Sequence, residues 1–312
     1  MPIQLLVPFG FGLFIFLWGL SKMRTGLENL ARNRLQSVLL RFTKTPVRSF
    51  WTGTVTTAFL QSSSAVTVLT IGFVNAGMLT FSQSLGIILG SNVGTTITTQ
   101  ILALKIEDFA IFLLVIGGGL TLLSNPFLKN TGSVCLGFGA IFWGIEWMQS
   151  ITESLKEQGW VSWLIHHGGN PVVSGLAAGI LITALIHSSS ACIAMAMGFY
   201  AAQVIPLPFA IAVVFGSNIG TCVTALMASI RTIPAAKQVA LSHLILNVAG
   251  AILFTPFIPV IARLAPYLSG DPATQIAHIQ TLFNLICSIA VLPFCDPFAR
   301  FITWLVPEKT SL

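Results

Sequence analysis

The chain has 312 residues, of which 54% are hydrophobic and only 8% are charged. A soluble globular protein carries about 25% charged residues, so this composition excludes a soluble fold and indicates an integral membrane protein. The formal net charge is +6, and most of the excess lies in the basic segment between Lys22 and Arg48, which is typical of a cytoplasmic loop, with a lipid or nucleic-acid patch as the less favoured alternative.

The apolar runs are long and do not alternate as barrel strands do, which favours an all-α bundle. Residues about 5–23 are long enough to span roughly 30 Å of hydrocarbon. The basic segment that follows carries leucines among its charges, a pattern of amphipathic helices at the interface.

The next apolar segment, about 50–75, is interrupted by Gln61-Ser62-Ser63-Ser64, the first serine cluster. Serine prefers helix caps to helix interiors because its hydroxyl competes for backbone groups. The sequence therefore predicts two half-helices that meet at this cluster as a re-entrant hairpin.

Residues about 82–104 contain Gly90-Ser91-Asn92-Val93-Gly94-Thr95, the first glycine tract. Glycine permits irregular backbone dihedrals, so we expect a broken transmembrane helix here. A short polar turn with Lys105, Glu107 and Asp108 follows, and then a helix at about 109–125.

Both motifs occur again 126 residues later. His187-Ser188-Ser189-Ser190 is the second serine cluster, and Gly216-Ser217-Asn218-Ile219-Gly220-Thr221 is the second glycine tract. The matches favour Ser, Gly, Asn and Thr over aliphatic residues, which indicates a duplicated site and not a duplicated apolar helix.

Each unit is expected to cross the membrane an odd number of times, so the second unit should be inverted. The division that follows is a first repeat at 1–132, a second at 133–262, and a C-terminal transmembrane helix with a short tail at 263–312. Inverted repeats with paired interrupted helices are typical of secondary transporters, with a binding site near the midplane.

The half-helices that begin at the serine clusters would direct free N–H groups and a positive dipole end at this site, which suits an anion. The candidate substrate-binding residues are Gln61, Ser62, Ser63, Ser64, His187, Ser188, Ser189, Ser190, Asn92 and Asn218. Unwound carbonyls and side-chain oxygens would offer hard ligands to a small cation such as sodium. The candidate sodium ligands are Thr95, Thr221, Asn92, Asn218, Ser64 and Ser190.

The serine cluster and the glycine tract, each present in both halves, resemble the type II sodium-dependent phosphate cotransporter family over residues about 10–230. The resemblance implies a multi-pass protein of the cell membrane that couples uptake of inorganic phosphate to sodium, with no organic cofactor. It also implies that the serine clusters, with Asn92, Thr95, Asn218 and Thr221, lie at the substrate and ion sites. His187 departs from the family, which usually has a second Gln, and this leaves a proton as an alternative coupling ion.

Other functions stay open. The alternatives are a transporter that exports phosphate or a related oxyanion, and an anion channel. An intramembrane hydrolase that uses His187 and a nearby serine is disfavoured, because adjacent positions rarely give the required geometry and Gln61 replaces the histidine in the first copy. We expect no enzymatic activity and no nucleic-acid partner, and a homodimer is left open.

Overall fold

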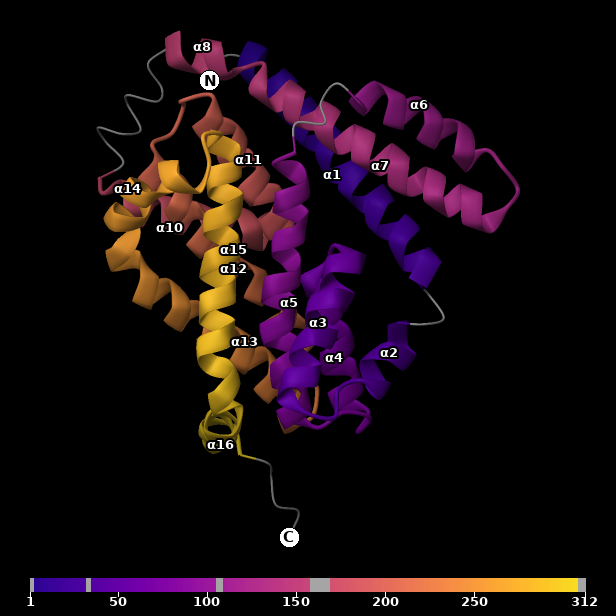
Figure 1. The fold of residues 1–312 in the computed structure, drawn as a ribbon, viewed down its shortest axis with the longest axis vertical. Helices are drawn as coiled ribbons and strands as arrows, with labels where there is room; N and C mark the ends of the chain where they lie inside the picture. Colours follow the sequence, from indigo (N-terminus) through magenta and orange to yellow (C-terminus); the bar gives the residue numbers. More distant parts are fainter. Residues whose placement is uncertain (1–2, 32–34, 105–108, 158–168, 308–312) are drawn as a thin grey trace.

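The computed structural model describes residues 3–31, 35–104, 109–157 and 169–307, and every regular element in these ranges is a helix (Figure 1). The predicted polar turn at 105–108 lies outside them. The helices are α1 (Ile3–Ala31), α2 (Leu35–Arg41), α3 (Pro46–Leu60), α4 (Ser63–Asn75), α5 (Phe81–Leu102), α6 (Ala110–Thr121), α7 (Pro126–Gln149), α8 (Thr152–Glu157), α10 (Pro171–Ile186), α11 (Ser189–Ala201), α12 (Leu207–Ala228), α13 (Pro234–Phe254), η2 (Thr255–Phe257), α14 (Ile258–Leu268), α15 (Pro272–Val291), η3 (Leu292–Phe294) and α16 (Cys295–Leu305).

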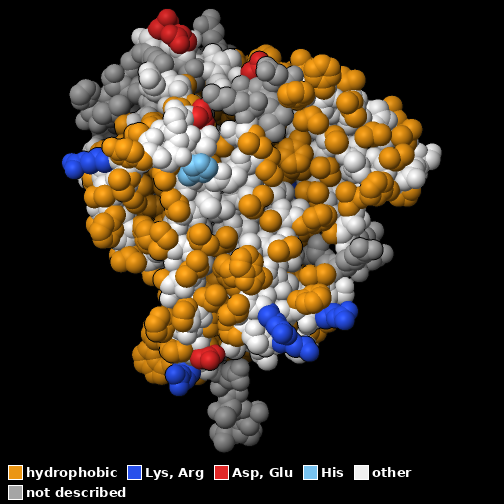
Figure 2. Space-filling model, in the orientation of Figure 1, with side chains coloured by type: hydrophobic (Ala, Val, Ile, Leu, Met, Phe, Trp, Pro, Cys, Tyr) orange, Lys and Arg blue, Asp and Glu red, His pale blue; other side chains and the backbone are white. Residues whose placement is uncertain are grey.

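Four helical segments of the described chain are long and apolar enough to cross a membrane: α5, α12, α13 with α14, and α15 with α16. The first two are mostly buried among other helices, whereas the last two are largely exposed. Figure 2 shows apolar side chains over the middle of the molecule and charged side chains near its upper and lower margins. The chain is therefore a multi-pass membrane protein.

Helices α3 and α5 run parallel with their backbones in direct contact. A Cβ atom added at Gly90 would lie 2.0 Å from the carbonyl oxygen of Phe50, and one added at Gly86 would lie 2.3 Å from that of Pro46. Because α5 begins beside the start of α3, the intervening α4 must carry the chain back along α3. The predicted pair of half-helices is thus present as a helical hairpin, α3–α4.

The expectation of broken helices at the glycine tracts is wrong. Helix α5 is continuous from Phe81 to Leu102, and α12 is continuous from Leu207 to Ala228. The physical reason is that the glycines provide close helix packing and not irregular dihedrals. Gly216 and Gly220 face the carbonyl oxygens of Leu176 and Ile180 on α10, as Gly90 and Gly94 face those of α3.

The corresponding first helices of the two halves, α1 and α7, pack antiparallel. Gly12 lies against Gly144, Gly19 against Gly137, and Gly26 against Asn130, so residue numbers increase along α1 as they decrease along α7. Figure 1 shows this pair crossing the upper part of the view, with α6 on its outer side. Small residues again permit the close approach.

The last two long segments share one construction. Helix α13 continues through the 3₁₀ turn η2 into α14, and α15 continues through η3 into α16. Pro256 and Pro293 occupy equivalent places in the two turns, 37 residues apart. Their contacts are also equivalent: α13 packs on α12 and α4, and α15 packs on α5 and α11. The contacts make α15–α16 the counterpart of α13–α14, and the predicted domain boundary at 262 falls inside α14.

Candidate functional site

The two serine clusters have the same backbone geometry. Gln61 ends α3 in the left-handed region with φ 56°, and Ser62 is extended before α4 begins at Ser63. His187 and Ser188 repeat this arrangement between α10 and α11, with φ 55° at His187. A positive φ is uncommon outside glycine, so its occurrence at both equivalent positions marks a specific backbone shape and not a chance irregularity.

Serine side chains cap both second half-helices. The Ser62 hydroxyl accepts a hydrogen bond from the backbone N–H of Ala65, and Ser188 accepts one from Ala191. A helix begins with four N–H groups that have no intrahelical partner, and the cap satisfies one of them. The first N–H groups of α4 and α11 therefore retain donor capacity beside hydroxyl groups, an arrangement that suits an anion.

The environments of the two clusters differ. Gln61 is buried, its Nε2 donates to the carbonyl of Ala58, and its Oε1 has no hydrogen-bond partner among the described residues. His187 is exposed instead, and its Nδ1 lies 3.3 Å from the hydroxyl of Thr224 on α12. Ser188 is buried, whereas Ser62 is half-buried. The duplicated backbone thus carries two chemically distinct sites.

Arg24 is a residue that the sequence did not connect with the site. Its Nε donates a hydrogen bond of 2.9 Å to the backbone carbonyl of Gln61, which brings a guanidinium to the break between α3 and α4. The corresponding position on α7 is Gln149, 125 residues later, so only the first half carries this cation. The sequence signal that could have pointed to Arg24 is its position directly after the first apolar segment.

Each glycine tract lies beside the helix break of its own half. Gly94 packs against Thr57 and Ala58, one turn before Gln61, and Gly220 packs against Thr183 and Ala184, one turn before His187. The halves also interlock, because α4 contacts α12 and α11 contacts α5. Within the described ranges, no hydrogen bond joins the first serine cluster to the second.

The candidate sodium ligands keep their side-chain oxygens but lose the expected backbone contribution. Because α5 and α12 do not unwind, their carbonyls stay within the helices. The hydroxyls of Thr95 and Thr221 donate 2.9 Å bonds to the carbonyls of Ser91 and Ser217 one turn earlier. Each hydroxyl oxygen still has lone pairs that face outward from that bond. The described residues contain no group of three His, Cys, Asp or Glu side chains suited to a metal.

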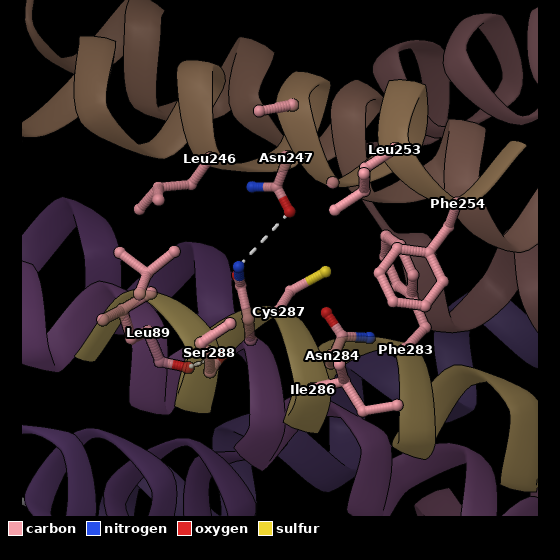
Figure 3. Close-up of a pocket in the computed structure, with 15 residues that line it drawn as sticks. Leu89, Leu246, Asn247, Leu253, Phe254, Phe283, Asn284, Ile286, Cys287 and Ser288 are labelled. Carbon is pink, nitrogen blue, oxygen red and sulfur yellow. Dashed lines mark hydrogen bonds between the residues drawn. The ribbon is translucent and has the colours of Figure 1, made fainter. Parts of the chain in front are cut away.

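The asparagines of the two glycine tracts contact the two kinked helix pairs, α13–α14 and α15–α16, each of which is interrupted by a 3₁₀ turn. Asn92 Nδ2 donates to Asn247 Oδ1 on α13 at 3.3 Å, and Asn218 Nδ2 donates to Asn284 Oδ1 on α15 at 3.0 Å. A mainly apolar cavity of about 220 Å³ lies between α5, α13 and α15. Figure 3 shows Asn247 and Asn284 on opposite walls of this cavity, with Phe254 and Phe283 at one end.

Comparison with known proteins identifies a matching family and several relatives. Residues 15–150 and 152–264 match the Na+/Pi-cotransporter family. The uncharacterized protein YqeW of Bacillus subtilis is 40% identical over 98% of this chain and 99% of its own length. The putative inorganic phosphate export protein YjbB of Escherichia coli O157:H7 is 27% identical over 96% of this chain, which spans 55% of that longer protein.

A shorter similarity extends to mammals. The sodium-dependent phosphate transport protein 2A of Oryctolagus cuniculus is 41% identical over 59 residues, 19% of this chain and 9% of that protein. No solved structure matches the chain. The family model matches most of the sequence, and this chain belongs to the Na+/Pi-cotransporter family.

Proposed function

We propose that this protein is a secondary transporter that moves inorganic phosphate across the cell membrane together with sodium. The observation that carries the proposal is the pair of helix breaks at Gln61 and His187, which have matching dihedrals and matching serine caps. The family and the names of the relatives support phosphate as the substrate. A transporter family also argues against an enzymatic role.

Phosphate would bind at the serine clusters. The N-terminal ends of α4 and α11 supply N–H donors and a positive dipole end, and the serine hydroxyls add further donors. Arg24 adds a positive charge at the first break, where its Nε is already bonded to Gln61. A cage of neutral donors with one guanidinium would bind a divalent anion while keeping the release of that anion feasible.

The architecture supports an alternating-access mechanism with inverted repeats. Helices α1 and α7 are equivalent in sequence order yet run antiparallel, as inversion requires. The hairpins α3–α4 and α10–α11 would be re-entrant, because each turns back at its serine cluster. Their tight backbone contact with α5 and α12 favours movement of each three-helix group as a rigid unit against the remaining helices.

Export is the second candidate. The relatives named as phosphate export proteins match 96% of this chain, whereas the named sodium-dependent transporter matches 19% of it. The same binding site serves either direction, because the imposed gradients and the relative energies of the two access states decide the net flux. Direction is therefore a separate measurement from substrate and coupling ion.

The proposal is tested with purified protein in liposomes and radiolabelled phosphate. Sodium, lithium, potassium or proton gradients are imposed one at a time, first inward and then outward. We expect saturable phosphate accumulation that follows the sodium gradient. Flux that never saturates and accumulates nothing would indicate a channel, and accumulation that follows only the proton gradient would replace sodium as the coupling ion.

A further inference from the structure

Asn247 on α13 and Asn284 on α15 occupy equivalent positions, 37 residues apart on the two kinked helix pairs. Both are buried, with 4% and 2% of their surface exposed. Each receives a hydrogen bond from the asparagine of one glycine tract, Asn92 or Asn218. A polar pair that recurs in both halves of an apolar bundle calls for a function beyond packing.

Asn247 and Asn284 are called the clamp residues, and the orientation of each side-chain amide is fixed by a second hydrogen bond. Asn247 Nδ2 donates 2.8 Å to the carbonyl of His243, and Asn284 Nδ2 donates 2.9 Å to the carbonyl of Gln280. An amide has its donors on nitrogen and its acceptor on oxygen. Because each nitrogen is held by its own helix, each Oδ1 faces the tract and accepts from the tract asparagine.

The tract asparagines are oriented in turn. Asn92 and Asn218 direct Nδ2 toward the clamp residues, and reversal of either amide would set two oxygens against each other. Their Oδ1 atoms make no hydrogen bond to any residue in the described ranges. What Asn92 and Asn218 present to a ligand is therefore a carbonyl oxygen, which binds a hard cation and repels an anion.

We infer that Asn247 and Asn284 are positioning residues that hold the Oδ1 atoms of Asn92 and Asn218 toward the cotransported cation. The inference rests on the proposed function and refines it: the tract asparagines belong to the cation site and not to the phosphate site. The clamps act from helices outside the two motifs, so cation affinity depends on the contact between α5 and α13 and between α12 and α15.

Ser288 provides a matched control for the alternative that the clamp residues have a purely structural role. The Ser288 hydroxyl donates 3.0 Å to the carbonyl of Leu89, so it also ties α15 to α5 at the wall of the same cavity, but it touches no tract asparagine. Ser288→Ala removes a contact of the same kind without freeing an amide.

The experiment compares the wild type with Asn247→Leu, Asn284→Leu and Ser288→Ala. Two quantities are measured: the sodium concentration for half-maximal phosphate transport in proteoliposomes, and the rise in thermal midpoint of detergent-solubilised protein when NaCl replaces KCl without phosphate. We expect either leucine variant to raise the half-maximal sodium concentration about tenfold, as loss of an orienting partner does in metal sites. The KM for phosphate at saturating sodium should stay within about twofold of the wild type, because the groups proposed to bind phosphate are unchanged in these variants.

The Ser288→Ala variant should keep the sodium response of the wild type in both measurements. A leucine variant with unchanged sodium response, or one that raises only the KM for phosphate, overturns the inference while the proposed function stands. An equal sodium shift in Ser288→Ala also overturns it, because the effect would then be structural. A wild type that responds to sodium in neither measurement overturns the sodium coupling and this inference together.

Discussion

Substitution of Gly90 by alanine tests whether the glycine tract serves packing or unwinding. The added Cβ would lie 2.0 Å from the carbonyl oxygen of Phe50 and 2.8 Å from the amide nitrogen of Thr54. Both obstacles are backbone atoms of α3, so no side-chain rotation relieves the clash. We therefore expect overpacking near the upper end of its ordinary range, about 3 kcal/mol.

The higher helix propensity of alanine opposes this loss by about 1 kcal/mol, which leaves a net destabilisation of about 2 kcal/mol. For a chain of this size the thermal midpoint should fall by about 4 °C. The control is Gly119→Ala on α6, where the new Cβ meets nothing within 4 Å. That variant should be as stable as the wild type or slightly more stable.

The assay is thermal unfolding of the purified protein in detergent, followed by intrinsic fluorescence, with both variants prepared in parallel. If Gly90→Ala unfolds at the same temperature as Gly119→Ala, the close contact of α3 and α5 is not required for stability. The idea that the tract glycines permit a broken helix would then regain its support. Gly216→Ala, which meets the Leu176 carbonyl at 2.2 Å, repeats the test in the second half.

Two further predictions concern the helix breaks. Ser188→Ala and Thr80→Ala each remove an N-terminal helix cap, so each should lower the free energy of unfolding by about 1 kcal/mol. Only Ser188→Ala should abolish phosphate accumulation in proteoliposomes. Equal transport by both variants would show that Ser188 does not belong to the site. Arg24→Gln gives the first half the residue that the second has at Gln149, and it should raise the KM for phosphate by about tenfold through loss of a charge-assisted contact. Unchanged phosphate kinetics in Arg24→Gln would show that the guanidinium only braces the Gln61 carbonyl.

The positions of the helix breaks could be predicted because their cause is local. A serine hydroxyl caps a helix through backbone groups two or three residues away, so the clusters at Ser62 and Ser188 identify the first turn of α4 and α11 without knowledge of the fold. The duplication made the prediction firmer. Whether these hairpins are re-entrant and the repeats inverted with respect to the bilayer stays a prediction.

The state of the glycine tracts could not be predicted because its cause is distant. Glycines spaced four apart, such as Gly86, Gly90 and Gly94, are compatible both with an unwound segment and with one face of a closely packed helix. The choice depends on the α3 backbone, about 40 residues earlier in the chain. Arg24 was missed for the same reason, since its partner Gln61 lies 37 residues away.

The chemical differences between the two halves affect the relative energies of the inward-open and outward-open forms of the proposed transporter. If the halves were identical and inverted, rotation about the axis between them would convert the inward-open form into the outward-open form, and both forms would have equal energy. The differences between Gln61 and His187, and between Arg24 and Gln149, would remove that equality at the proposed binding site. Without ligand, the proposed transporter would then favour one of the two access states and bind phosphate more tightly from one side of the membrane, while the imposed gradients still set the direction of net flux.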